Sequence, residues 1–261
     1  QIQEFIQKKE RLIELLEEQK KSIIFCAVTK GLKNEDLTID DFGIFGSIPK
    51  SWKKTKLKYV AYNLNNRRIP IESSDRGRMT ERLYDYYGAT GVIDKVDNYI
   101  YDETTLLVAE DGANLVFRNI QLVYKASGKY WVNNHAHIIK ERNDINIDFL
   151  GFLLELTDYN PVITGSAQPK LTKEAFMSTL IMKPNKVEQD EIVYYILEKQ
   201  KPLNNSISKA QTEIEKAKEY QESLITQIVT GQLKVPENTY TIIKNNKDLN
   251  MVAEPSNAYQ S

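Results

Sequence analysis

The two histidines of the chain, His135 and His137, stand two residues apart. On a strand, side chains at this spacing point to the same side, so the pair offers the beginning of a metal site. The chain has a single cysteine, Cys26, and no further histidine, whereas structural zinc sites are built mainly from three or four such ligands. We therefore expect no metal, with one histidine packed or hydrogen-bonded and His135 near a binding surface.

The segment YGATGVI at 87–93 contains two glycines, which raises the possibility of a phosphate-binding loop. A loop of the dinucleotide-binding kind needs GxGxxG between a strand and a helix. Here the residues after Gly91, VIDKVDNYIYD, have the composition of a strand. Gly88 and Gly91 are therefore expected to permit positive φ in a turn between two strands. Such a turn presents Thr90 and bare backbone amides on a surface.

Catalytic motifs are missing from the sequence. No GxxxxGK[ST] loop for ATP is present, and no Ser/His/Asp or Cys/His arrangement stands out. A DNA methyltransferase would need a cofactor loop and an Asn/Asp-Pro-Pro-aromatic motif, but Asn160-Pro161-Val162 lacks the second proline and the aromatic residue. We expect a non-catalytic protein that holds no cofactor.

Positive charge is concentrated in one segment, although the whole chain has a net charge of −1. Residues 50–82 contain ten basic and three acidic side chains, which gives this segment a net charge of +7. A local excess of this size can bind a polyanion even on a nearly neutral protein. A solvated, lysine-rich surface with no ligand explains the same charges.

Two heptad-patterned segments enclose this middle part, and the second repeats the first at an offset of 201 residues. SIIFCAVTKGLK at 22–33 aligns without gaps to SLITQIVTGQLK at 223–234. The simplest arrangement is an antiparallel coiled coil with the middle domain at one end; two unrelated amphipathic helices are the alternative. The predicted interface residues are Ile6, Ile13, Leu16, Ile23, Ile207, Ile214, Ala217, Leu224 and Ile228.

The expected fold is α+β: a mixed, β-rich domain flanked by two long helices. Within the domain we expect a strand at 57–62, a helix at 147–158 and a final strand in STLIMKP, and we expect Pro202 to kink or interrupt the last helix. The predicted parts are a helix at 1–31, a domain at 32–185, helices at 186–235 and a polar tail at 236–261. No apolar run approaches the ~20 residues of a membrane helix, and the lone cysteine suggests a reducing, cytoplasmic location.

Several segments together resemble the DNA specificity subunits of type I restriction-modification enzymes. In chain order they are the helix end VTKGL, then GSIPKSW, YYGATGVIDKVDNYIYD, EDGANL, GKYWVNNHAHII, GSAQPKL and KPNKVEQDEI, and finally the helix end VTGQL. The resemblance implies a target-recognition domain that reads one half of a split DNA target. It also implies helices that dock methyltransferase subunits and, through them, the restriction subunit. A chain with one recognition domain, beginning with Gln1, would be a fragment or a half-subunit able to dimerise.

Under this resemblance, basic side chains would hold phosphates and polar side chains would read bases. Arginine suits guanine, and asparagine or glutamine suits adenine. The tyrosines would stack on bases or pack in the core, and Gln168 would contact DNA or brace its loop. The candidate DNA-binding residues are Arg76, Arg78, Arg82, Tyr86, Tyr87, Thr90, Asn114, Lys129, Tyr130, Asn133, Asn134, His135, Gln168 and Lys170. The alternative is a coiled-coil scaffold that binds a protein and no DNA.

Overall fold

The computed structural model divides the chain into two compact units. The smaller unit contains residues 1–17 and the chain from Asn204 onward, and the larger contains residues 18–203. The boundaries between the two units lie within the two long helices. The structure describes residues 1–33, 36–39, 46–142 and 144–233; the predicted polar tail at 236–261 lies outside them.

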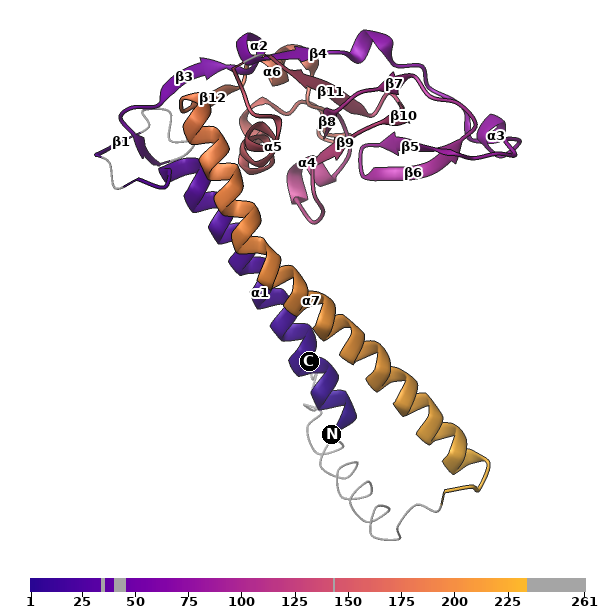
Figure 1. The fold of residues 1–261 in the computed structure, drawn as a ribbon. Coiled ribbons are helices and arrows are strands. Elements are labelled where there is room, and N and C mark those ends of the chain that lie inside the picture. The colour runs from indigo at the N-terminus through magenta and orange to yellow at the C-terminus, as the bar shows by residue number, and fades with distance from the viewer. Residues whose placement is uncertain (34–35, 40–45, 143, 234–261) are drawn as a thin grey trace, which may run out of the picture. The chain divides into compact units, whose positions relative to one another are not determined.

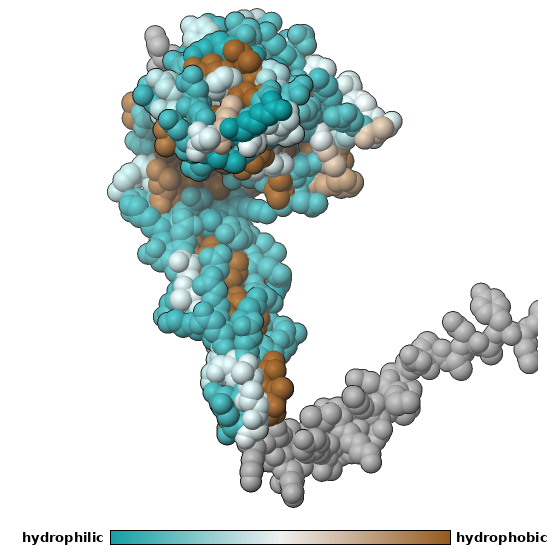
Figure 2. Space-filling model, turned by 90° about the vertical axis from the view of Figure 1, so that its right-hand side faces the viewer, coloured by the Kyte–Doolittle hydropathy of each residue, from teal (hydrophilic) through white to brown (hydrophobic). Residues whose placement is uncertain are grey.

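In the smaller unit, α1 (Ile2–Lys30) and α7 (Lys186–Val229) run antiparallel, as the heptad pattern predicted (Figure 1). The interface between the two helices buries Ile6, Ala210 and Ile214. The half-buried Lys9 ammonium also meets the Glu213 carboxylate at 2.6 Å. The antiparallel coiled coil expected from the repeat is confirmed, and Figure 2 shows its narrow hydrophobic stripe between hydrophilic flanks.

The predicted interface residues differ in how far they are covered. Ile207 is buried like Ile6 and Ile214. Ile228, in contrast, is exposed, and its neighbours Ile225 and Val229 near the end of α7 are exposed as well. The remaining predicted interface residues, both within this unit and beyond it, are partly covered: Ile13, Leu16, Ile23, Ala217 and Leu224.

Pro202 does not interrupt α7, which runs through this proline as one helix, so the part of the expectation that concerned an interruption is wrong. Proline removes one N–H from the helical hydrogen bonds and leaves the carbonyl of Glu198 without its usual partner. Pro202 and Glu198 are both on the exposed part of the helix, where water can hydrate that carbonyl.

The larger unit is built around two four-stranded sheets. In the first, β5 pairs with β6 in an antiparallel hairpin and with β10 in parallel, and β7 pairs with the other edge of β10. In the second sheet all neighbours are antiparallel. The strand order of the first sheet is β6 (Gly91–Val96), β5 (Tyr84–Gly88), β10 (Lys129–Val132) and β7 (Tyr101–Asp102); that of the second is β4 (Ala61–Asn63), β11 (Ala136–Glu141), β8 (Thr105–Ala109) and β9 (Val123–Ala126).

Two strand pairs and several short helices complete this unit. The predicted final strand is confirmed as β12, which pairs with β3. The strand pairs are β12 (Leu180–Lys183) with β3 (Lys53–Lys56) and β1 (Leu37–Ile39) with β2 (Ser47–Pro49). The helices are α2 (Leu57–Val60), η1 (Asn65–Arg67), α3 (Ser73–Arg76), α4 (Asn114–Phe117), α5 (Ile147–Leu156), η2 (Asn160–Val162) and α6 (Lys173–Ser178).

The strand expected at 57–62 is wrong over most of its length. Leu57–Val60 forms the helical turn α2, and only Ala61 onward is strand. Leu57 and Val60 are both buried. Residues three apart lie on one side of a helical turn but on opposite sides of a strand, so the turn lets both enter the same core.

The main core of the larger unit lies between α5 and the second sheet. The helix predicted at 147–158 is confirmed as α5, and its N-terminus is capped by Asn146, whose Oδ1 accepts hydrogen bonds from two backbone amides. Trp52 joins this core edge-on to Phe149, and its indole N–H donates to the buried Glu188 at 3.0 Å. No helix in the described ranges is both long and apolar enough to cross a membrane.

Candidate functional site

Three segments that are distant in sequence meet around a hollow of about 330 Å³ on the larger unit. They are the β5–β6 turn, the segment that follows β8, and the connection between β10 and β11. Four of the predicted binding residues line this hollow: Thr90, Asn114, Asn133 and His135. Asp111 and Ile93 also line it, and neither was singled out from the sequence, although Asp111 lies within the EDGANL segment.

The β5–β6 turn forms one wall of the hollow, and its two glycines are needed for different reasons. Gly91 has φ +94°, as predicted for the turn, and a Cβ there would lie 3.0 Å from the Tyr124 ring. Gly88 does not have positive φ, so that part of the expectation is wrong. A Cβ on Gly88 would instead meet Ile93 at 2.9 Å and the Asn133 amide at 3.2 Å, so Gly88 permits close packing.

The NNHAH segment forms the second wall. The backbone N–H of Asn133 donates to Tyr87, and its side-chain oxygen accepts from the His135 backbone N–H at 2.8 Å. The His135 imidazole Nδ1 then lies 2.9 Å from a carboxylate oxygen of Asp111. His135 keeps a half-exposed ring that solvent reaches, and its location near a binding surface stays a prediction.

The two histidines do not share a side, as a regular strand would require. β11 begins at Ala136, so His135 precedes it, whereas His137 is fully buried and stacks on Phe176 at 4.8 Å. Over the residues that the structure describes, no three His, Cys, Asp or Glu side chains gather as metal ligands.

A buried polar network lies beneath the hollow. The Nε2 of His137 is 2.8 Å from the Leu171 carbonyl oxygen, so Nε2 must carry the proton. Nδ1 then accepts from the Asn65 amide at 2.9 Å. Burial lowers the pKa of His137, which favours this neutral form.

Glu110 is the charged member of the network. Its carboxylate accepts from Arg68 at 2.6 Å and lies 3.4 Å from the Lys170 ammonium. Burial tends to raise the pKa of Glu110, but the hydrogen bond from Arg68 and the neighbouring positive charges outweigh it and hold the pKa below its usual value. Glu110 therefore stays ionised and fixes Arg68 beneath the hollow.

The GSAQPKL loop is tied to the hollow by its backbone. Pro169 accepts a hydrogen bond from Gly112, and Lys170 exchanges two backbone hydrogen bonds with Thr164. Gln168 is exposed. Its backbone carbonyl oxygen leaves no room for a Cβ at Gly165. These contacts favour the bracing role for this loop, while Lys170 and Gln168 still reach solvent.

The three predicted arginines lie elsewhere, on the segment 69–82 beside the first sheet. Arg76 is largely covered: its Nε donates to Asp94 at 2.9 Å and its guanidinium lies over the Tyr86 ring. Arg82 donates to the same Asp94 carboxylate. Hydrogen bonds from Arg76 and from a backbone amide lower the pKa of Asp94. Arg78 is the most exposed arginine of the three, and Arg82 is exposed as well.

The predicted tyrosines belong mainly to the core. Tyr86 and Tyr130 are each 1% exposed, so of the two roles left open from the sequence the structure gives them packing. The Tyr130 hydroxyl is 2.7 Å from Thr105, and burial raises its pKa. Tyr87 is half-buried against Tyr130. The last two predicted residues, Lys129 and Asn134, are exposed.

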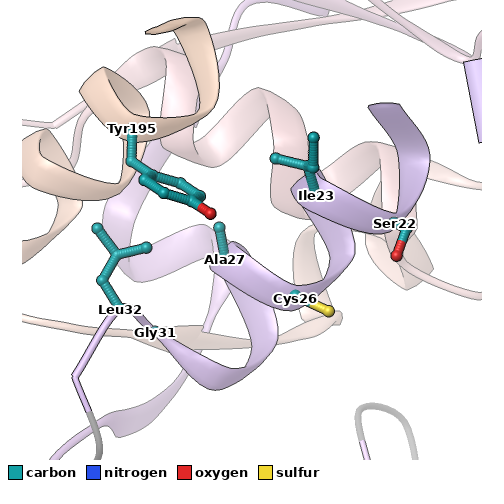
Figure 3. Close-up of a pocket in the computed structure, with 7 residues that line it drawn as sticks. All are labelled: Ser22, Ile23, Cys26, Ala27, Gly31, Leu32 and Tyr195. Carbon is teal, nitrogen blue, oxygen red and sulfur yellow. The ribbon is translucent and has the colours of Figure 1, made fainter. Parts of the chain in front are cut away.

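A second concavity, of about 530 Å³, lies where α1 and α7 enter the larger unit (Figure 3). Tyr195 reaches from α7 toward Ala27 on α1, and Leu32 closes one end. Ile23, predicted as a seam residue, lines this groove together with Cys26. Phe25 and Tyr194, the sequence neighbours of the lining residues Cys26 and Tyr195, are exposed apolar side chains.

Comparisons with known proteins support one family. A family model described as "Type I restriction modification DNA specificity domain" matches residues 49–218. A protein from Haemophilus influenzae that is named as a type I restriction enzyme specificity subunit is 36% identical over 143 residues, which cover 54% of this chain and 35% of that protein. The EcoprrI specificity subunit of Escherichia coli is 27% identical over 126 residues, or 48% of this chain and 30% of its own.

Solved structures share the fold. The type I restriction-modification S subunit of M. genitalium superimposes with a TM-score of 0.56 at 11% identity, covering 85% of this chain and 56% of that one. A chain from a study of complex assembly and conformational transition of the type I R-M system gives 0.54 at 12% identity, with coverages of 87% and 56%. The chain thus spans about a third of the length of these curated relatives and about half of these solved chains.

Proposed function

The chain belongs to the type I restriction modification DNA specificity family, and from this premise we propose that its larger unit reads one half of a bipartite DNA target. The observation that carries the proposal is the hollow, where Thr90, Asn133 and His135 meet from separate segments. Hydroxyl, amide and imidazole groups are the kinds of side chain that recognise base edges. In this proposal the chain supplies specificity and no catalytic group.

Within the hollow, we assign direct base contacts to Thr90 and His135, because Thr90 is exposed and His135 is half-exposed. Asn133 is nearly buried and holds the His135 backbone, so we assign it to positioning. The Asp111 carboxylate orients the His135 ring and can itself accept from the amino group of cytosine or adenine.

Phosphate contacts are assigned to the exposed cations. Arg78 and Lys129 have exposed side chains, and Lys170 is half-exposed next to Glu110. Such contacts give affinity without sequence information and make binding fall steeply with added salt. Arg76 and Arg82 are assigned to holding segment 69–82 through Asp94.

We further assign the docking of modification subunits, and through them of the restriction subunit, to the helix groove of Figure 3. Its apolar lining residues, among them Ile23, Leu32 and Tyr195, offer the kind of surface that a partner protein covers. Replacing Tyr195 with arginine should abolish co-purification with the modification subunits. Tyr59→Arg, an equally simple change at an exposed tyrosine of α2, should leave co-purification intact.

The decisive experiment is methylome sequencing of cells that carry this chain with its modification subunits. We expect a bipartite methylated motif. Thr90→Val and His135→Ala should change or relax bases in one half only, with a loss of ~1–3 kcal/mol of discrimination for each base contact. Thr212→Val, at an exposed threonine of α7, should leave the motif unchanged. A complex that assembles but neither methylates nor retains DNA would favour the scaffold alternative.

A further inference from the structure

The tip formed by α4 and the loop after it, residues 114–120, carries an unusual amount of exposed apolar surface. Phe117 is 69% exposed, and Val116 and Ile120 are exposed beside it. Figure 1 shows this tip projecting from the body of the larger unit. Moving a large aromatic side chain out of water lowers the free energy. Its exposure on a projecting tip therefore favours a bound partner that covers it.

The tip is held in one conformation by its own polar groups. The Asn114 side chain closes the loop on itself, because its oxygen accepts from the Ile120 N–H and its amide donates to the Ile120 carbonyl, both at 3.0 Å. Arg118 has φ +54° and donates through its guanidinium to the Thr157 and Glu155 carbonyls near the end of α5. Phe117 therefore stands on a braced loop, which lowers the entropy lost on binding.

The same loop borders the hollow. Asn114 lines the hollow and is one helical turn from Phe117, and the exposed Ile93 lines the hollow from β6. A concavity that carries polar side chains such as Thr90 and His135, beside a rigid apolar projection, fits a duplex better than a flat protein surface. The concavity can face base edges, and the projection can enter the adjacent step.

We propose that Phe117 inserts against a base step of the DNA next to the bases that face the hollow, and stacks on an unstacked base there. This inference rests on the proposed reading of DNA by the hollow. It adds Phe117 as a wedge, an apolar side chain that enters a base step. Asn114 is then a positioning residue for the wedge and not a base reader. Because stacking accepts any base face, the wedge selects for steps that unstack easily, such as pyrimidine–purine steps.

The test uses the complex of the full chain with its modification subunits and a duplex carrying the motif found by methylome sequencing. 2-Aminopurine is substituted, one position at a time, at bases of the half-site and its flanks other than the methylated base. We expect a fluorescence rise at one step with the unsubstituted chain. Phe117→Ala should abolish the rise and weaken target binding roughly 5- to 150-fold, while Phe117→Leu should keep part of both.

Two controls separate the outcomes. Tyr59→Ala removes a similarly exposed aromatic ring on α2 and should change neither signal. Asn114→Ala should lower the fluorescence rise by loosening the tip. If Phe117→Ala binds and unstacks DNA normally, or if it disrupts assembly with the modification subunits without DNA, the wedge is overturned. If the unsubstituted complex does not bind its motif, the proposed function itself fails.

Discussion

Arg76 and Arg78 are two residues apart but should respond to alanine substitution in opposite ways. Arg76 is held by Asp94 and by the Ile71 carbonyl, and its guanidinium lies 4.6 Å from the centre of the Tyr86 ring. Arg78 is exposed, and its guanidinium lies 3.8 Å from the Asp75 carboxylate. We expect Arg76→Ala to destabilise the larger unit, and Arg78→Ala to weaken DNA binding without a change in stability.

The size of the Arg76 effect follows from its contacts. A hydrogen bond to a charged group contributes about 1.5–3 kcal/mol, and a cation–π contact about 0.5–1 kcal/mol. Asp94 would keep its hydrogen bonds from Arg82 and from the Lys95 amide, so it would not become an unpaired buried charge. The free energy of unfolding should therefore fall by about 2–4 kcal/mol.

Urea unfolding of the chain, followed by circular dichroism, measures this difference. Arg78→Ala should unfold within about 0.5 kcal/mol of the original chain, and its DNA affinity in the complex should have a salt slope reduced by about 1. If Arg76→Ala unfolds like the original chain but loses DNA binding, segment 69–82 is a reading surface and the assignment of Arg76 to structure is wrong.

Two further predictions concern the frame of the hollow. Burial lowers the folded-state pKa of His137, so the unfolded chain binds more protons than the folded chain at mildly acidic pH. The free energy of unfolding should therefore fall as pH drops below about 6.5, by up to about 1.4 kcal/mol per pH unit, until the folded-state pKa is reached. Urea titrations from pH 8 to 5 test this, and the dependence of the unfolding free energy on pH should be weaker in His137→Gln. Gly91→Ala should cost about 1–3 kcal/mol from positive φ alone and more from contact with Tyr124, whereas Gly112→Ala, with φ +102° and open space around it, should cost only the first part. Equal losses in the two glycine variants would contradict the contact with Tyr124.

The helices were predictable because their signal is local and repeated. Heptad spacing placed Ile6, Ile207 and Ile214 in the seam, and all three are buried there. The secondary-structure predictions failed where the same residue types are compatible with two local structures. Leu57 and Val60 fit a strand by composition, yet a helical turn buries both. Pro202 breaks helices in general, but in α7 the freed carbonyl lies in an exposed stretch.

Four of the residues proposed from the sequence line the hollow, but their assembly there could not be predicted. Thr90, Asn133 and His135 come together because β10 pairs in parallel with β5 across some forty intervening residues. No local pattern encodes that pairing. Charge clustering was misleading for the same reason: Arg76 and Arg82 belong to a segment of high net charge, but the β6 residue Asp94 binds both.

The hollow and the network beneath it are built from neighbouring residues with opposite roles. Glu110 is buried and pairs with the partly covered Arg68, while the next residue, Asp111, lines the hollow. His137 is likewise buried, while His135 faces the hollow from just before β11. Because the buried members fix the backbone, a change at Asp111 that keeps its size should leave the fold in place. Asp111→Asn should accordingly alter base preference with little loss of stability, whereas Glu110→Gln should unfold more easily. Equal stability losses would show that reading and folding are not separated in this way.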